Sequence, residues 1–355
     1  MKRHVSALGG WAIAVAGLTS VLAACSDNTM TSVPAREYLE TRLVADTAGL
    51  GAASIDTSLK NPWGMAFGPT GMLWVSDNHS GASTLYDTTG AKSALVVAVP
   101  SSGGAAGGAP SGIVFNPTTD FVIPGSSKAL FIFAGEDGVI SAWNTSTGNA
   151  TLVADRSANG AVYKGLALAA NGGANFLFAT DFKQNGVDVF DATFHFVKSF
   201  TDSTVPAGYA PFGIRAIGNQ LYVTFAKQLA PDNQDDEPGP GNGYVDVFNA
   251  DGTLAKRLAT RGTLNSPWGV VAAPAGFGGF SRDLLVGNFG DGRIGAYDPT
   301  TGGFIDVLRD GTGNPIVIDG LWGLTFGPGA DSTTLFFAAG PDGEAHGLLG
   351  KLTPK

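Results

Sequence analysis

The chain has almost no cysteine, since only Cys25 is found among its 355 residues. A single cysteine can form neither a disulfide within the chain nor a cluster of thiolate metal ligands. Charged residues are also scarce, at 14% of the sequence, and there is no cluster of Lys and Arg of the kind that a phosphate backbone attracts. We therefore expect no nucleic-acid partner. The formal net charge of −9 fits cations or neutral ligands better.

Several signatures of catalysis are missing as well. The sequence contains no Gly-x-Ser-x-Gly elbow, phosphate-binding loop, zinc-binding pair or dinucleotide fingerprint. After residue 38 we find no helical periodicity of useful length. The apolar runs are short and end at Gly, Pro, Asn or Asp, which favours strands over buried helices. With 52 glycines and 19 prolines, the chain is predicted to be an all-β protein of many short strands.

The amino terminus has the pattern of an export signal. Basic side chains at positions 2–4 precede an uncharged apolar run over residues 5–24. The run leads into Leu-Ala-Ala-Cys, which resembles the bacterial lipobox. Residues 1–24 are therefore predicted to be a lipoprotein signal peptide and Cys25 to be lipidated, with an ordinary signal peptide as the alternative. Each buried methylene contributes about 0.8 kcal/mol, so several acyl chains on Cys25 would anchor the protein firmly in a membrane.

The residue after Cys25 indicates to which membrane the lipoprotein would be sorted. In sorted lipoproteins an Asp next to the lipidated cysteine favours retention in the inner membrane, so Ser26 favours the outer membrane if the cell has one. Residues 25–37 are small, polar and without periodicity, and they are predicted to form a flexible tether. Residues 38–354 are predicted to form a single domain, which we expect to be monomeric.

One short motif recurs through this domain. It is clearest as Asn-Pro-Trp-Gly near residue 61, and its shared glycine returns at intervals of 48, 53, 48, 56 and 54 residues. A period near 50 residues is typical of a repeat architecture. The repeats begin near residues 61, 109, 162, 210, 266 and 320, and their glycines are Gly64, Gly112, Gly165, Gly213, Gly269 and Gly323.

Each repeat contains four short apolar runs separated by turn residues. Four such strands make one antiparallel sheet, and six sheets arranged radially make a six-bladed β-propeller. The last repeat has room for only three strands. Residues 43–46 read Leu-Val-Ala-Asp, which is identical to the fourth-strand residues 152–155. We therefore predict that an N-terminal strand completes the last blade and removes an exposed edge.

These motifs resemble the NHL-like six-bladed propellers of exported bacterial proteins. The Pro-Trp-Gly starts, the Leu-Trp-Val-Ser-Asp-Asn strand end at residues 73–78 and the aromatic-Asp turns carry the resemblance. More closely, the chain resembles an uncharacterised family of exported bacterial propellers, some members of which end in a PEP-CTERM sorting tail. This chain ends in Leu-Thr-Pro-Lys instead, and a lipid anchor would replace the tail. The resemblance implies the architecture and leaves the activity open, because one fold hosts many functions.

The loops between the second and third strands of the repeats all carry a carboxylate, and they should surround one mouth of the central channel. Calcium and other divalent cations prefer such oxygen ligands. The alternative is turn chemistry, because Asp-Gly and Asn-Gly pairs favour tight turns whatever the function. The candidate metal ligands nearest the strand ends are Asp77, Asn78, Glu136, Asp181 and Asn288.

Aromatic residues recur immediately before the shared glycine. They would either line the mouth for a sugar or an apolar ligand, or pack between neighbouring blades. The residues concerned are Trp63, Phe212, Trp268 and Trp322.

Three histidines lie in loops of the domain. His79 and His346 fall in the same class of loop and could act as general bases at the mouth, whereas His195 is expected on the opposite face. Solvated loop histidines are the alternative.

The longest insertion is acidic and rich in proline, and it covers residues 231–242. It is either a lid or docking loop, as long loops in compact domains often are, or a solvated decoration.

Three functions remain open at this stage. The first is an exported, lipid-anchored propeller that binds a ligand, a glycan or a protein through its loop face without catalysis. The second is a metal-dependent hydrolase or lactonase similar to gluconolactonase, although the ligands of that family cannot be matched residue by residue to this chain. The third is a structural component of the cell envelope.

Overall fold

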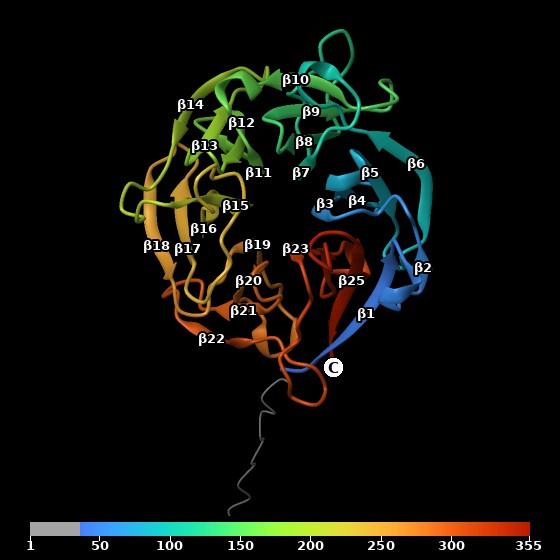
Figure 1. Cartoon of the computed structure of the whole chain (residues 1–355), viewed down its shortest axis with the longest axis vertical. Helices are drawn as coiled ribbons and strands as arrows, with labels where there is room; N and C mark the ends of the chain where they lie inside the picture. The colour runs from blue at the N-terminus through green and yellow to red at the C-terminus, as the bar shows by residue number, and fades with distance from the viewer. Residues whose placement is uncertain (1–35) are drawn as a thin grey trace, which may run out of the picture. The chain divides into compact units, whose positions relative to one another are not determined.

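The Pro-Trp-Gly repeats form the innermost strands of six antiparallel sheets, which stand in a ring around a central axis (Figure 1). This computed structural model describes residues 36–355. The predicted signal peptide, Cys25 and nearly all of the predicted tether lie outside the described residues. The prediction of an all-β, six-bladed propeller is confirmed. No helix between residues 36 and 355 is long and apolar enough to cross a membrane.

The blades follow one another in chain order, and each runs from the axis outward. Blade one consists of β3 (Pro62–Phe67), β4 (Leu73–Asp77), β5 (Ala82–Tyr86) and β6 (Lys92–Ala98). Blade two consists of β7 (Pro110–Phe115), β8 (Phe131–Gly135), β9 (Val139–Trp143) and β10 (Thr151–Asp155). Blade three consists of β11 (Tyr163–Asn171), β12 (Ala174–Asp181), β13 (Gly186–Phe190) and β14 (Phe196–Phe200).

The second half of the ring repeats this order. Blade four consists of β15 (Tyr209–Ile217), β16 (Gln220–Lys227), β17 (Gly243–Asn249) and β18 (Leu254–Thr260). Blade five consists of β19 (Pro267–Ala272), β20 (Leu284–Asn288), β21 (Ile294–Tyr297) and β22 (Phe304–Val307). Blade six consists of β23 (Leu321–Phe326), β24 (Leu335–Ala339), β25 (Leu348–Pro354), β1 (Tyr38–Ala45) and β2 (Ser54–Ile55). Six single-turn 3-10 helices lie in the connections: Ala48–Leu50, Asn78–Ser80, Ser102–Gly104, Ser157–Asn159, Gly278–Phe280 and Gly329–Asp331.

Blade six is closed by the N-terminal strand, as predicted. β1 pairs antiparallel with β25, from Tyr38 opposite Pro354 to Ala45 opposite Leu348. Just beyond β1, the buried Asp46 carboxylate binds Lys60 and the ring of His346, so the two ends of the propeller are also joined by side chains. The sequence did not predict β2, which adds a fifth strand parallel to β1.

The blades are held together by apolar side chains that fill the wedge between neighbouring sheets. Between blades one and two, for example, the Trp74 ring stacks on Phe131 with centroids 4.0 Å apart and meets Trp143 at 4.7 Å. Aromatic side chains bury a large area each, which suits a wedge that widens away from the axis. A single sheet cannot bury the apolar side chains on both of its faces. Each blade therefore depends on its neighbours for a stable core.

Near the axis the sheets approach so closely that only glycine fits. A Cβ atom on Gly64 would lie 2.5 Å from the main-chain oxygen of Ser111 in the next blade, and one on Gly269 would lie 2.7 Å from that of Trp322. The other shared glycines meet the next blade in the same way, and Gly323 of blade six closes the ring against Trp63 of blade one. The repeated glycine is therefore explained by contact between backbones rather than by a turn.

Candidate functional site

Residues of the innermost strands line three hollows that follow one another along the axis of the propeller. In β3, for example, Trp63 lines the hollow on the loop face, Gly64 lines a narrow middle section, and residues 65–67 line the hollow on the other face. We call these the mouth pocket, the waist and the funnel. The funnel is lined by residues 65–67, 113–115, 117, 166–168, 215–216 and 325–326.

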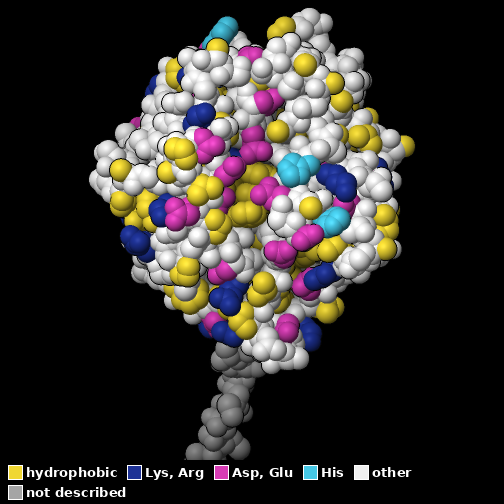
Figure 2. Space-filling model, viewed as in Figure 1, with side chains coloured by type: hydrophobic (Ala, Val, Ile, Leu, Met, Phe, Trp, Pro, Cys, Tyr) yellow, Lys and Arg dark blue, Asp and Glu magenta, His cyan; other side chains and the backbone are white. Residues whose placement is uncertain are grey.

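The mouth pocket combines acidic and aromatic side chains in a cavity of about 330 Å³. Figure 2 shows acidic side chains around the hollow at the centre of this face. Carboxylates outnumber basic groups, because Lys164 is the only Lys or Arg in the lining. The lining residues are Trp63, His79, Glu136, Lys164, Asp235, Asp236, Phe289, Trp322, Gly343 and Glu344.

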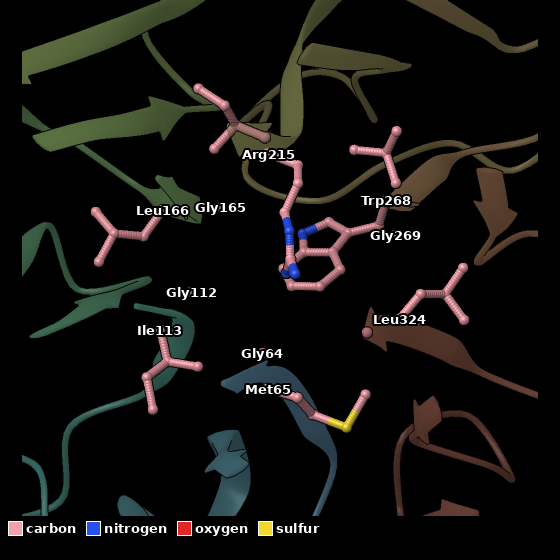
Figure 3. Close-up of a pocket in the computed structure, with 13 residues that line it drawn as sticks. Gly64, Met65, Gly112, Ile113, Gly165, Leu166, Arg215, Trp268, Gly269 and Leu324 are labelled. Carbon is pink, nitrogen blue, oxygen red and sulfur yellow. The ribbon is translucent and has the colours of Figure 1, made fainter. Parts of the chain in front are cut away.

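The waist below the pocket is narrow, with a volume of about 40 Å³. Five of the six shared glycines line it beside apolar side chains, and the side chains of Arg215 and Trp268 project into its centre (Figure 3). Such a space holds a water molecule but no larger ligand.

An aromatic cluster closes the axis between the mouth pocket and the waist. Trp63 and Trp322 stack with their ring centroids 3.6 Å apart, and Phe289 stacks on the other face of Trp322 at 4.0 Å. Trp268 meets both tryptophans edge-on at 5.9 Å, and Phe212 lies 5.8 Å from Trp322. We call these five residues the aromatic plug. The four aromatic residues before the shared glycines are thus buried, mainly against one another on the axis, although Trp63 and Trp322 also form the floor of the mouth pocket.

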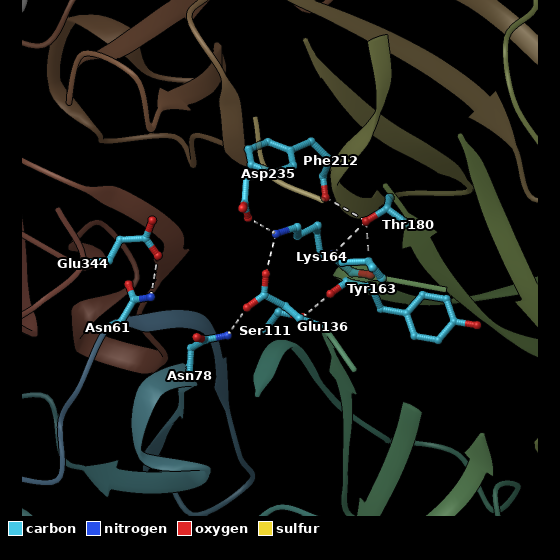
Figure 4. A network of polar contacts seen from close by, with 12 residues as sticks. Asn61, Asn78, Ser111, Glu136, Tyr163, Lys164, Thr180, Phe212, Asp235 and Glu344 are labelled. Carbon is cyan, nitrogen blue, oxygen red and sulfur yellow. Dashed lines mark hydrogen bonds and ion pairs between the residues drawn. The ribbon is translucent and has the colours of Figure 1, made fainter. Parts of the chain in front are cut away.

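Lys164 is the centre of a polar network at the pocket wall (Figure 4). Its side chain is 2% exposed, and its ammonium group binds the Glu136 carboxylate and lies 3.6 Å from Asp235. The Asn78 amide donates to Glu136 over 2.7 Å. The Lys164 ammonium also lies 5.0 Å from the ring centre of Trp63, within the range of a cation–π interaction. Although burial acts in the opposite direction, the neighbouring carboxylates raise the pKa of Lys164, which therefore stays charged.

A second network joins the pocket wall to the aromatic plug. The buried Asn61 side chain accepts a hydrogen bond from the Trp322 indole over 3.1 Å and donates one to Glu344 over 2.6 Å. Its amide nitrogen also lies 3.3 Å from His79. Asn61 therefore fixes the plug and orients one of the pocket carboxylates at the same time.

Two pocket carboxyl groups hold their protons more tightly than usual. Burial raises the pKa of Asp236 to about 6, although the charge of Lys164 opposes the shift. Burial also raises the pKa of Glu344, which Asn61 opposes by its hydrogen bond. The negative charge of the pocket therefore changes in the mildly acidic range.

The acidic insertion at residues 231–242 folds over the edge of the mouth. Its own backbone hydrogen bonds give it a fixed shape, including Leu229 to Asp235 at 2.8 Å and Glu237 to Lys227 at 2.8 Å. The Gly239 amide donates to the Asn265 side chain of the next blade over 2.7 Å. Asp235 and Asp236 thereby reach the pocket lining, which favours the interpretation of the insertion as part of a binding site.

The structure does not bring the five predicted metal ligands together. Three of these side chains accept a hydrogen bond from a main-chain N–H group instead. Asp77 accepts one from Thr84 at 3.0 Å, and Asp181 accepts one from Val162 at 3.0 Å. Asn288 accepts one from the main-chain N–H of Asn265 at 3.2 Å. These three side chains fix backbone at the strand ends, as the turn-chemistry alternative holds. Only Asn78 and Glu136 share a network, and there the Lys164 ammonium already lies beside the carboxylate. Within residues 36–355 no group of three or more His, Cys, Asp or Glu is placed so that it could hold a metal ion.

Asp77→Asn tests this interpretation. Asp77 is fully buried, one of its oxygens has no partner, and burial raises its pKa well above the usual value. A raised pKa means that ionisation costs stability as the pH rises, whereas below about pH 4 the carboxyl is neutral in both the folded and the unfolded state. At pH 8 we expect the free energy of unfolding of the variant to exceed that of wild type by about 1.4 kcal/mol for each pKa unit of the shift. At pH 3.5 we expect the two proteins to be equally stable.

The measurement is urea unfolding of both proteins at the two pH values. Lower stability of Asp77→Asn at pH 8, or loss of a bound divalent ion from the variant, would contradict the structural role assigned to Asp77.

The predicted histidines are separated by the structure. His79 is exposed and lines the mouth pocket. His346 does not line it, because its ring lies 3.0 Å from the Asp46 carboxylate at the closure of blade six. His195 lies in the turn between β13 and β14, where its ring meets Thr193 at 2.8 Å. A pair of histidine bases at the mouth is therefore not formed.

Sequence analysis did not name Lys164, Glu344 or Asn61 as site residues, and it included Asp235 and Asp236 only as part of the insertion at residues 231–242. A signal for Lys164 was present, because it occupies the position before the shared glycine where four other repeats have Trp or Phe. A lysine in that position departs from the repeat, and a departure from a structural pattern often marks a functional site.

Comparison with known proteins finds relatives that match most of the chain. It is 34% identical to "Uncharacterized protein R648" of Acanthamoeba polyphaga mimivirus over 317 residues, which cover 85% of this chain and 76% of that protein. It is also 34% identical to "Uncharacterized protein L690" of the same virus over 315 residues, with 85% and 82% covered. No protein-family model matches the chain.

Solved structures share the fold at much lower identity. Virginiamycin B lyase from Staphylococcus aureus superimposes with a TM-score of 0.54 and 17% identity, over 89% of this chain and 99% of the lyase. A gluconolactonase from Xanthomonas campestris gives a TM-score of 0.53 and 15% identity, over 84% of this chain and 87% of that one. At such identities the likeness extends to the propeller fold alone.

Proposed function

The chain belongs to the protein family of mimivirus R648 and L690, and we propose that it functions as a binding protein that holds a small organic cation in the mouth pocket, without catalysis. The observation that carries the proposal is the charge of the lining. Four carboxylates face the cavity, and its single ammonium group, that of Lys164, is already bound to Glu136. The pocket therefore keeps negative charge for a ligand.

The aromatic plug supports the same choice of ligand. Phe289 covers Trp322 on one side and is itself only partly buried, so its outer face is available at the pocket floor. A ring face attracts ammonium groups, and carboxylates beside it strengthen the attraction. The cavity of about 330 Å³ is at the small end of the usual range for ligand pockets, which suits an amine of a few carbons.

The proposal includes the membrane location predicted from the sequence. Cys25 would be lipidated and Ser26 would direct the protein to an outer membrane, with residues 25–37 as the tether. In this position the protein would present a cation-binding pocket on the envelope. Detection of the acyl group on Cys25 by mass spectrometry would test the anchor separately from the pocket.

Binding is tested by calorimetry of the full chain with 1,4-diaminobutane, with 1,4-butanediol as the neutral compound of the same length. We expect the diamine to bind and the diol not to bind. Glu344→Gln should weaken diamine binding about tenfold, since the loss of one close charge is worth about 1.4 kcal/mol. Asp232→Asn is the control, because Asp232 lies in the same insertion but does not line the pocket. Equal binding of the two compounds, or equal effects of the two variants, would reject the proposal.

The pKa values give the binding a pH dependence. Burial raises the pKa of Asp236 to about 6, so this carboxylate is charged at pH 8 and neutral at pH 5. We expect diamine binding to weaken as the pH falls through 6, and to weaken less in Asp236→Asn. Calorimetry at pH 5, 6, 7 and 8 measures this. A flat profile in wild type would show that Asp236 does not contribute to the charge that the ligand meets.

A hydrolase or lyase active at the same pocket is the second candidate. It is favoured by Asp236, because a carboxyl group with a pKa near 6 can donate and accept protons at neutral pH, and His79 lines the same cavity. The lyase and lactonase that share the fold make lactones and cyclic esters suitable test substrates. Turnover that survives a chelator and is lost in Asp236→Asn would favour this candidate over simple binding. Turnover lost on chelation would favour the metal-dependent lactonase predicted from the sequence.

A further inference from the structure

Arg215 stands alone at the base of the funnel, on the face opposite the mouth pocket. It is the second residue after the shared glycine of its repeat, a position that carries small or apolar side chains in most of the other blades. The six equivalent residues are Ala66, Val114, Ala167, Arg215, Val271 and Thr325. Arginine in this position is therefore a departure from the repeat, as Lys164 is on the other side of the aromatic plug.

Unlike Lys164, Arg215 has no counter-ion. Its one side-chain hydrogen bond goes to the Thr325 hydroxyl at 3.4 Å, and it forms no ion pair within residues 36–355. The side chain is partly exposed to the funnel, but the surrounding protein removes enough water to lower the pKa of the guanidinium group. An arginine stays charged even so. An unpaired charge in such a place costs stability unless an anion offsets it.

The funnel has the shape and chemistry of a pocket for an apolar ligand body. It encloses about 370 Å³, and apart from Arg215 and Thr325 its lining side chains are apolar. No carboxylate lines it. The shared glycines narrow the channel to the waist beyond Arg215, and the aromatic plug closes it further on, so the funnel ends at the guanidinium group. A ligand that enters from the open side would place its head on Arg215 and its body against the apolar wall.

We propose that the funnel binds an organic monocarboxylate with an apolar chain, whose carboxylate pairs with Arg215 and accepts a hydrogen bond from Thr325. Guanidinium groups bind carboxylates in a two-pronged geometry that neither an alcohol nor an amine can replace. The proposal is independent of the amine site, because the aromatic plug lies between the two hollows.

The test compares three eight-carbon probes on the full chain: octanoate, octanol and octylamine. We expect calorimetry to detect octanoate binding, with octanol and octylamine at least tenfold weaker. Octanoate should also raise the melting temperature, because a ligand that binds the folded state alone stabilises it. Arg215→Gln should reduce octanoate affinity at least tenfold and raise the melting temperature of the free protein, since it removes an unpaired charge.

Two further variants make the result specific. Ala216→Trp keeps the guanidinium group but fills the funnel next to it, and it should abolish octanoate binding while the protein stays folded. Arg282→Gln removes an exposed arginine outside the funnel and should leave binding unchanged. The inference is overturned if wild type does not bind octanoate, if it binds octanol as tightly, or if Arg215→Gln and Arg282→Gln bind octanoate equally.

Discussion

Gly213→Ala is expected to lower the free energy of unfolding by about 3 kcal/mol or more, a large effect for a single methyl group. The added Cβ would overlap the main-chain oxygen of Trp268 in the next blade. A backbone atom cannot rotate away as a side chain can. The strain can be relieved only if β15 and β19 move apart, and both belong to the closed ring of innermost strands.

The control for this prediction is Gly49→Ala. A Cβ on Gly49 would have no heavy atom within 4 Å, and this glycine lies in a short helix outside the ring. The change should therefore stay within about 0.5 kcal/mol, as surface substitutions usually do. Urea unfolding followed by tryptophan fluorescence measures both variants. If Gly213→Ala is as stable as Gly49→Ala, the shared glycine is not required by the close approach of the blades.

The architecture could be predicted because the sequence contains six copies of one repeat. A single Pro-Trp-Gly would have been a weak signal, but the return of its glycine, in looser copies of the motif at a nearly constant period, identified the repeat unit and the number of blades. The closure was predictable for a similar reason, because residues 43–46 repeat the fourth-strand residues 152–155. β2 was not predictable, since a strand of two residues has no periodicity of its own.

The site was harder to predict because the same residue types serve turns and binding. Asp77 and Asn78 are neighbours in the chain, yet Asp77 is turned into the blade to hold the Thr84 amide and Asn78 reaches Glu136 at the mouth. The direction of each side chain depends on where the strand ends, and sequence patterns locate strand ends only approximately. Asp235 and Asp236 reach the pocket because of the fold of the insertion, which no local pattern specifies.

Lys164 and Arg215 both depart from the repeat, but only Lys164 has a counter-ion within residues 36–355. Lys164 replaces an aromatic side chain on the loop face and is neutralised by Glu136, whereas Arg215 replaces a small side chain on the other face and is left without a partner. The aromatic plug keeps them apart. A charge that is already paired contributes to structure, and one that is not leaves its pairing to a ligand. The lysine therefore belongs to the framework of the mouth pocket, and the arginine to a recognition site.

Glu136→Gln tests the structural half of this distinction, with an expected loss of about 3 kcal/mol in the free energy of unfolding. The variant leaves the Lys164 ammonium group 2% exposed, beside an aromatic ring and with only the exposed carboxylate of Asp235 as a partner. Breaking a buried ion pair costs about 3–5 kcal/mol, and the lower end applies because Glu136 is itself 24% exposed.

A double variant separates the cost of the stranded charge from the value of the pair. Glu136→Gln with Lys164→Met removes both charges and leaves an apolar chain against Trp63, so we expect its stability to return to within about 1 kcal/mol of wild type. Asp235→Asn is the matched single control. Its carboxylate is 74% exposed and 3.6 Å from the same ammonium group, so its loss should cost less than about 1 kcal/mol. If the double variant is no more stable than Glu136→Gln, the loss comes from the missing hydrogen bonds of Glu136 and not from an unpaired Lys164.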